Sequence, residues 1–380
     1  QDVVEWANKY LGPESYAIIY KREGKDPDEQ KIAAPKITPI VTNRDSQSEF
    51  LSEIQTSQVQ PIEPVFVDYK KDMSQFEAQP GIDVLYKKNE TNDIFTLIYV
   101  FNTGTENDPA LNLAFNYLSY LGTDKMTAEE IASEMYDIAC SFYMNAGANQ
   151  SSIQITGLSE NMGKAMEIVE GLIAGAKPDE AILENLKGDM LKSRADAKLN
   201  QSRCFGALQR YLFYGGDFIR RTTLTDPALQ ALTSEQLLAK IGGLMGKQHE
   251  VLYYGPQKET EIKSALAEHH KVAADLQPLE KKFSALLPTD ANKVVLAQYD
   301  AKQLYYLQFS NRGEKFDVAA DPEITLYNEY FGGGMNTIVF QEMREARGLA
   351  YSAWATLATP SNANGDYSYY AFIATQNDKM

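Results

Sequence analysis

The sequence predicts an α+β fold made of two related domains, each an antiparallel-rich β-sheet with helices packed on one face. One observation is that short β-rich runs alternate with amphipathic helical stretches along most of the chain. A second is that the same order of strands and helices occurs twice, with similar short sequences at corresponding places. Tyr117–Gly122 in the first copy resembles Asn328–Gly332 in the second, and each is followed by a helix and then an aromatic-rich strand.

Size and charge exclude some classes of function. The chain has 380 residues, of which 44% are hydrophobic and 23% charged, so it can bury more than one large core. Its 52 acidic and 36 basic residues give a net charge of −16, which repels nucleic acid, and no nucleic-acid partner is predicted. No apolar run approaches the roughly 20 residues of a membrane helix, so no transmembrane segment is predicted. Cys140 and Cys204 are too few for a disulfide framework and are predicted to be buried free thiols.

The N-terminal part predicts a domain end followed by a linker. Residues 2–20 predict an amphipathic helix and then a strand, without a signal-peptide core. Residues 1–22 are therefore interpreted as the end of a preceding domain, with the native N-terminus expected upstream. Residues 23–68 are rich in Pro, Gln, Ser and charge, which is typical of a linker that could act as a hinge.

Residues 69–275 are predicted to form the first domain. Gly81–Tyr86 and Asp93–Phe101 read as two strands that pair across a polar turn as a hairpin. Thr127 with Glu130 three residues later predicts a capping box that opens a helix. The further elements expected are helices over 111–121 and 127–138, strands over 142–145 and 151–158, a long helical tract over 161–214, a strand over 250–254 and a helix over 259–269.

Residues 283–380 are predicted to form the second domain. Its expected elements are strands over 293–298 and 303–309, helices over 322–331 and 337–345, and strands over 350–357 and 366–374. Since the pattern stops at Met380, before counterparts of the closing helices, this domain is expected to be truncated. An aromatic set is predicted to pack the sheet, with its outward members able to line a substrate path: Tyr305, Tyr306, Tyr367, Tyr369 and Tyr370.

The run from Asp108 to Thr123 is similar to the zinc-binding segment of the pitrilysin/insulinase family of inverzincin peptidases. In that family His-x-x-Glu-His is followed by Gly-Thr. Anchoring on the Gly-Thr pair places the three functional positions on Leu113, Asn116 and Tyr117. None of them supplies the imidazole ligands or the carboxylate base that zinc hydrolysis needs. The resemblance therefore implies the metal-free half of the family, with no metal in this fragment.

Other candidate ligands are also scarce. The family's third ligand, a glutamate, would fall near Ser193 or Arg194. Of the three histidines, His249 leads a strand, while His269 and His270 are adjacent on a helix and point about 100° apart. They are predicted to be ordinary surface or capping histidines that form no zinc pair. Neither cysteine has a histidine in a recognisable companion motif, so a nucleophilic dyad is not predicted.

The run from Tyr330 to Ser352 closely resembles the signature of the family's fourth domain. A Gly-rich turn leads into a helix bearing Arg344, and Tyr351 follows seven residues later at a strand start. In the family this pair reaches the substrate bound at the other half's zinc, and both side chains are donors that could steady the scissile peptide. The plainer alternative is a helix-end cation and a half-buried strand aromatic. Gly332–Gly334 predict backbone freedom and close packing, since no Gly-Lys-Ser/Thr makes them a phosphate loop.

The resemblance implies the C-terminal half of a zinc metalloendopeptidase, which forms part of a clamshell chamber and positions peptide substrates. This fragment is expected to be proteolytically inactive alone, with zinc in an N-terminal half of the same polypeptide. A bacterial cell-envelope or periplasmic location is the family-level expectation. Two alternatives stay open: a non-catalytic scaffold or regulatory subunit, and a module that binds extended peptides by strand addition. A His-x-x-Glu-His upstream of Gln1 would favour the peptidase.

Overall fold

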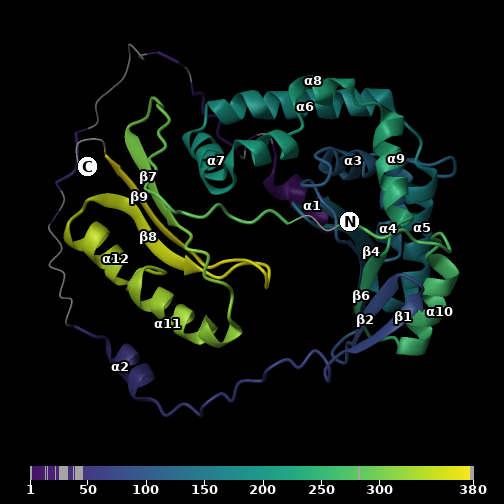
Figure 1. Cartoon of the computed structure of the whole chain (residues 1–380), viewed down its shortest axis with the longest axis horizontal. Coiled ribbons are helices and arrows are strands. Elements are labelled where there is room, and N and C mark those ends of the chain that lie inside the picture. The colour runs from purple at the N-terminus through teal and green to yellow at the C-terminus, as the bar shows by residue number, and fades with distance from the viewer. Residues whose placement is uncertain are drawn as a thin grey trace. The chain divides into compact units, whose positions relative to one another are not determined.

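The structure, a computed structural model, describes residues 2–12, 14, 16–21, 23–24, 33–36, 38, 46–280 and 283–376. The chain divides into two compact units, Gln1–Val65 and Phe66–Met380. The second unit holds both β-sheets of the described chain and their helices (Figure 1). The predicted α+β class is confirmed.

The described residues of the first unit contain two helices. Helix α1, Asp2–Tyr10, is the predicted amphipathic helix, and α2 spans Glu49–Thr56. Helix α2 lies within the predicted linker and was not predicted; Ser48 caps it by accepting a hydrogen bond from the Leu51 N–H at 3.1 Å. The strand predicted before Tyr20 is wrong, because residues 16–21 have no ladder partner among the described residues. Much of the predicted linker, including 25–32 and 39–45, lies outside the described residues.

The larger sheet has six strands in the order β1-β2-β6-β3-β5-β4. Strands β2 and β6 are parallel and the other neighbours are antiparallel. Strand β4 lies at one edge of the sheet and, among the described residues, pairs with β5 alone. The six strands are β1 (Ser74–Gln79), β2 (Ile82–Lys88), β3 (Ile94–Phe101), β4 (Cys140–Ala146), β5 (Ser151–Leu158) and β6 (His249–Gly255).

The predicted hairpin of β2 with β3 is wrong. Strand β6 lies between them, and Leu252 pairs with Leu85 on one side and with Ile98 on the other. Strand β2 instead forms its hairpin with β1, a strand that was not predicted, through a turn where Gly81 has φ of +90°. Each strand's own pattern was interpreted correctly, but a partner more than a hundred residues away decides which ladder forms.

Eight helices accompany this sheet in the described part of the unit. Helix α4 opens with the predicted capping box, in which Thr127 and Glu130 each bond the other's backbone N–H. The predicted helical tract over 161–214 is split at residues 176–179 and at 199–200, and it ends where Gly215, whose φ is +81°, interrupts α7. The helices are α3 (Leu111–Leu118), α4 (Ala128–Asp137), α5 (Met162–Gly175), α6 (Glu180–Lys198), α7 (Gln201–Thr222), α8 (Asp226–Ala231), α9 (Ser234–Met245) and α10 (Glu259–His269).

The smaller sheet has the order β7-β9-β8, which repeats the order β3-β5-β4 of the larger one. Helices α11 and α12 run along one face of it (Figure 1). The strand predicted over 293–298 is wrong, and Val294 and Leu296 are exposed there. The elements are β7 (Gln303–Ser310), α11 (Asp321–Phe331), α12 (Ile338–Phe340) continued by a π-helical turn (Gln341–Ala346), β8 (Ala350–Ala358) and β9 (Ser368–Gln376).

Helix α7 packs aromatic rings on the smaller sheet. The ring centroid of Phe205 lies 5.5 Å from that of Tyr305 and 5.9 Å from that of Phe372. The ring of Phe213 lies 5.4 Å from that of Tyr370. These contacts agree with the predicted packing role of Tyr305 and Tyr370. They stabilise the sheet by burying large apolar surfaces between elements that are distant in sequence.

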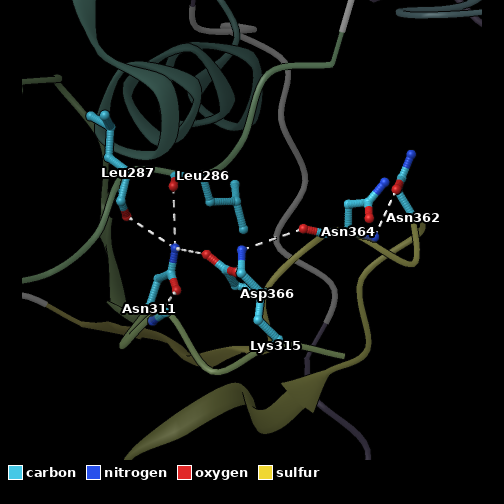
Figure 2. A network of polar contacts seen from close by, with 8 residues as sticks. Leu286, Leu287, Asn311, Lys315, Asn362, Asn364 and Asp366 are labelled. Atoms are coloured by element: carbon cyan, nitrogen blue, oxygen red, sulfur yellow. Dashed lines mark hydrogen bonds and ion pairs between the residues drawn. The ribbon is translucent and has the colours of Figure 1, made fainter. Parts of the chain in front are cut away.

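A buried amide ties the segment before β7 to the loop before β9 (Figure 2). The Asn311 Nδ2 donates to the carbonyl oxygens of Leu286 and Leu287 at 3.2 and 3.4 Å, and lies 3.5 Å from Asp366 Oδ2. The Lys315 ammonium bonds Asp366 Oδ1 at 2.6 Å, and this contact holds the pKa of Asp366 below its usual value. Asn311 is 1% exposed, so its amide replaces water as the partner of these carbonyls.

Candidate functional site

Helix α3 carries the three positions that the zinc motif would occupy. Leu113 and Tyr117 are 2% and 0% exposed and belong to the core of the larger sheet. The Tyr117 hydroxyl accepts the Asp179 N–H at 2.7 Å and lies 2.8 Å from Ser234 Oγ. Only Asn116 is exposed. Two of the three positions are thus filled by packed side chains whose environment leaves no room for an ion.

The position expected for the third zinc ligand is also occupied by residues without a ligand role. Arg194 on α6 bonds the Leu224 carbonyl at 2.7 Å and forms an ion pair with Asp226, while its neighbour Ser193 is exposed. Among the residues that the structure describes, no group of three or more His, Cys, Asp or Glu is arranged to hold a metal ion.

Both cysteines are free thiols; Cys140 is buried as predicted, whereas Cys204 is half-buried. No helix in the described ranges is long and apolar enough to cross a membrane.

His249 leads β6 and His269 ends α10, as predicted, but the surroundings of the histidines differ from those predicted. His249 and His270 are buried, with their Nε2 atoms 2.9 Å apart, and His270 Nδ1 lies 2.5 Å from Glu170 Oε1. His249 is therefore neither a surface nor a capping residue, and the surface interpretation of His270 is wrong as well. His270 does occupy the C-cap position of α10, and His269 is half-buried in the last turn of that helix, 3.6 Å from Glu167. Sequence spacing gave no signal, because β6 and the α10 terminus meet only in the fold.

The structure brings the two predicted substrate-positioning residues together. The guanidinium carbon of Arg344 lies 4.8 Å from the ring centroid of Tyr351 and 4.8 Å from that of Phe340. Its Nε is 3.5 Å from Glu345 Oε1. Tyr351 is 75% exposed, so it is not the half-buried strand aromatic of the plainer interpretation. Arg344 stays compatible with a helix-end cation, since it lies in the last turn of its helical segment.

Both residues lie on irregular backbone. Arg344 belongs to the π-helical turn Gln341–Ala346, a geometry that is rare and often found at functional sites. Tyr351 is the extra residue of a β-bulge, because Ala350 pairs with Thr375 and Ser352 already with Ala374. A bulge redirects a side chain out of the strand's alternation. Neither feature was visible in the sequence.

Glycines set the distance between this turn and its sheet. A Cβ on Gly332 would lie 2.3 Å from the Ala355 carbonyl oxygen, and one on Gly333 would lie 2.9 Å from the Asn328 carbonyl oxygen. A Cβ on Gly334 would meet nothing within 4 Å. The predicted close packing is therefore found at the first two glycines. At Gly332 this packing holds the end of α11 against β8, the strand on which Tyr351 lies, whereas at Gly333 it is made with α11 itself.

No family model matches the sequence. An uncharacterised zinc protease of Streptomyces coelicolor is 23% identical over 266 residues, which are 65% of this chain and 56% of that protein. The peptidase M16 inactive domain from Pseudomonas fluorescens has a TM-score of 0.65 at 18% identity and is matched over 80% of this chain and 74% of its own. The periplasmic protease PqqL from Escherichia coli has a TM-score of 0.66 at 15% identity, over 91% of this chain and 38% of its own.

Two of the three positions that the resemblance assigns to the zinc motif, Leu113 and Tyr117, are core side chains in a fold shared with an M16 inactive domain. The predicted resemblance to the pitrilysin-type zinc peptidases is confirmed: this chain is related in sequence to zinc proteases and has the fold of an M16 inactive domain. It spans only 56% of the length of the Streptomyces relative.

Proposed function

We propose that this chain is the C-terminal, non-catalytic half of a zinc metalloendopeptidase and that it positions peptide substrates with Arg344 and Tyr351. The observation that carries the proposal is the pairing of an exposed phenol with a guanidinium on irregular backbone, in a chain with the fold of an M16 inactive domain. Both groups are hydrogen-bond donors that could hold a scissile carbonyl or its oxyanion.

The zinc and its ligands belong, in this proposal, to an N-terminal half of the same polypeptide. Support comes from the described residues, which offer no metal-binding cluster, and from relatives that are zinc proteases. The segment over 23–68 would join the halves as a hinge, which agrees with the division of the chain at Val65. A cell-envelope location is also a proposal; the solved relative PqqL is a periplasmic protease.

The test is hydrolysis by the assembled two-half protein. Replacing Tyr351 by Phe should reduce peptide hydrolysis strongly while the zinc content stays unchanged. Full activity of that variant would refute the role assigned to Tyr351. A parent sequence without a His-x-x-Glu-His upstream of Gln1 would instead favour a scaffold or regulatory subunit, the class that the filled motif on α3 also permits.

A further inference from the structure

The outer edge of the larger sheet is open beside a shallow pocket. Strand β4 is the last strand in the order β1-β2-β6-β3-β5-β4, so one side of its backbone has no ladder partner in the described part of the chain. A pocket of about 240 Å³ lies between this strand and α3. The lining residues that bear on binding are Asn112, Phe115, Asn116, Ser119, Phe142 and Met144.

The register shows which backbone groups face the open edge. In the antiparallel pairing of β4 with β5, residues on the two strands that face each other alternate between pairs that exchange hydrogen bonds and pairs that do not. The Leu158 N–H bonds the Ala139 carbonyl at 3.2 Å and the Gly147 N–H bonds the Gln150 carbonyl at 2.8 Å. Odd-numbered residues of β4 therefore bond inward to β5.

The N–H and C=O groups of the even-numbered residues Phe142 and Met144 consequently point to the open edge. No hydrogen bond to these four groups is found within the described residues. The carbonyl of Ala146, next in the same set, is approached by the Asn112 Nδ2 of α3 at 3.4 Å. This contact confirms the outward direction and places a side-chain amide of α3 along the edge.

The pocket walls are uncharged. Phe115 lines the pocket as a buried apolar side chain, while Asn112 and Asn116 present carboxamides one turn apart on α3 and Ser119, the C-cap residue of α3, presents a hydroxyl. A carboxamide carries both a donor and an acceptor, which is the pattern of a peptide group. Asn116 has the further property that it is the one exposed position of the filled zinc motif.

We propose that this groove, formed by the β4 edge and α3, binds an extended peptide segment by strand addition. The segment would add to β4 through the backbone groups of Phe142 and Met144, and Asn116 would bond its main chain. An extended segment with small, uncharged side chains fits better than a second copy of this chain, because α3 forms one wall of the pocket and a second sheet would bring its own helix layer against it.

The repeat adds a reason to expect a peptide here. Strand β4 ends the order β3-β5-β4 as β8 ends the order β7-β9-β8, so the groove and Tyr351 lie on corresponding edge strands. The inference thus rests on the proposed function for its choice of ligand. It names a second peptide-holding site, away from the Arg344 and Tyr351 pair.

The test measures binding to this chain with a fluorescein-labelled peptide of nine alternating valine and serine residues flanked by lysines. Fluorescence anisotropy should saturate with a Kd on the order of 10⁻⁵–10⁻⁴ M, as expected for a few main-chain hydrogen bonds and a small apolar contact. The same peptide with every N–H of its core methylated should not bind. Since both peptides carry the same charge, attraction to a chain of net charge −16 cancels in the comparison.

The matched variants are Met144→Pro and Met144→Ala. Both shorten the side chain, but only proline removes the outward N–H, and an edge strand accepts proline at such a position. Met144→Pro should weaken binding about fivefold or more, since one hydrogen bond is worth roughly fivefold. Met144→Ala should weaken it less than about twofold, with Asn116→Ala between the two. Circular dichroism would confirm that each variant is folded.

Equal binding of the two Met144 variants, or of the two peptides, would overturn the proposal. So would the absence of saturation at millimolar probe. Sedimentation velocity tests whether a second copy of this chain binds the β4 edge. If the chain forms a dimer and Met144→Pro dissociates it, the edge is a dimer interface and not a peptide site. None of these results bears on the proposed function, which is read from hydrolysis by the assembled protein rather than from binding at β4.

Discussion

The Nε2 atoms of His249 and His270 lie 2.9 Å apart in the core, between β6 and the end of α10. The Nδ1 of His249 is 2.7 Å from the Lys247 carbonyl oxygen, which only accepts, so this nitrogen carries a proton. In neutral His249 the Nε2 then accepts the hydrogen bond that His270 Nε2–H donates. His270 Nδ1 also lies 2.5 Å from Glu170 Oε1, so close polar contacts run from β6 through the end of α10 to α5.

Acid should weaken the folded state through His249. Burial lowers the pKa of His249 from 6.5 to about 4, because the charged imidazole would lose its hydration. The unfolded chain therefore binds more protons than the folded chain between these two values. The contribution to the free energy of unfolding is complete above pH 6.5 and is lost as the pH falls toward 4. At about 1.4 kcal/mol per pKa unit it amounts to roughly 3 kcal/mol.

Urea unfolding at pH 7.5 and pH 4.5 measures this effect, with His249→Gln as the control. Glutamine cannot titrate, so the variant should lose less stability between the two pH values. The groups that face His249 and its partner stay the same in both proteins: Glu170 from α5, His270 at the α10 terminus and Tyr99 from β3. Identical losses in wild type and variant would show that His249 does not titrate as its burial indicates.

Gly332→Ala should destabilise the protein by about 1–3 kcal/mol, the usual cost of overpacking. The added methyl would lie 2.3 Å from the Ala355 carbonyl oxygen, so the end of α11 and β8 would have to separate. Gly334→Ala is the matched control, because its Cβ meets nothing within 4 Å and its stability change should stay within about 0.5 kcal/mol. Chemical denaturation of both variants gives the comparison. Equal effects would show that the turn is not packed as described.

Asn311→Ala should cost about 1–3 kcal/mol, because the Leu286 and Leu287 carbonyls would be left without a buried partner. Asn362→Ala is the control; its side chain only accepts the Asn364 N–H at the exposed end of the same network (Figure 2). The change should therefore be within about 0.5 kcal/mol. Thermal unfolding followed by near-ultraviolet circular dichroism distinguishes them, and a fully stable Asn311→Ala would contradict the anchoring role.

Local signals in the sequence predicted local structure well. The capping box of Thr127 and Glu130 is confirmed because both partners lie within one helical turn. The strands before and after α3 are also confirmed, since their β-rich pattern matches a sheet with one face against helices. That Leu113, Asn116 and Tyr117 cannot supply zinc ligands or a carboxylate base follows from the sequence alone, because these side chains lack the required chemistry wherever they lie.

Long-range pairing could not be predicted in the same way. Residues of β6 insert between β2 and β3, and nothing in the pattern of residues 81–101 indicates this. The meeting of His249 with His270, the bulge at Tyr351 and the π-helical turn around Arg344 also depend on tertiary packing. The run 293–298 has the pattern of a strand but lacks a neighbour to pair with among the described residues.

The chain should bind no stoichiometric zinc. Metal analysis after dialysis should find none, and a chelator should not shift the melting temperature, because Leu113 and Tyr117 fill the ligand positions with core side chains. Tyr117→Phe should instead cost about 1–2 kcal/mol, since it leaves the Asp179 N–H without its acceptor. One tightly held zinc per chain would refute the assignment of the motif to α3.

In the assembled two-half peptidase, Tyr351→Phe should lower kcat/KM by roughly 10²–10³, the cost of losing one donor to a developing oxyanion. Arg344→Lys keeps the charge but loses the planar guanidinium that lies 4.8 Å from the Tyr351 ring, so a comparable loss there would indicate directional hydrogen bonding. Both variants should unfold at nearly the wild-type temperature, since Tyr351 is 75% exposed and contributes little to the core. A structural role predicts the reverse, a lowered melting temperature with intact activity of the folded fraction. Zinc content and thermal unfolding are therefore measured together with hydrolysis. A Tyr351→Phe enzyme that keeps full activity would refute the substrate-positioning role of Tyr351.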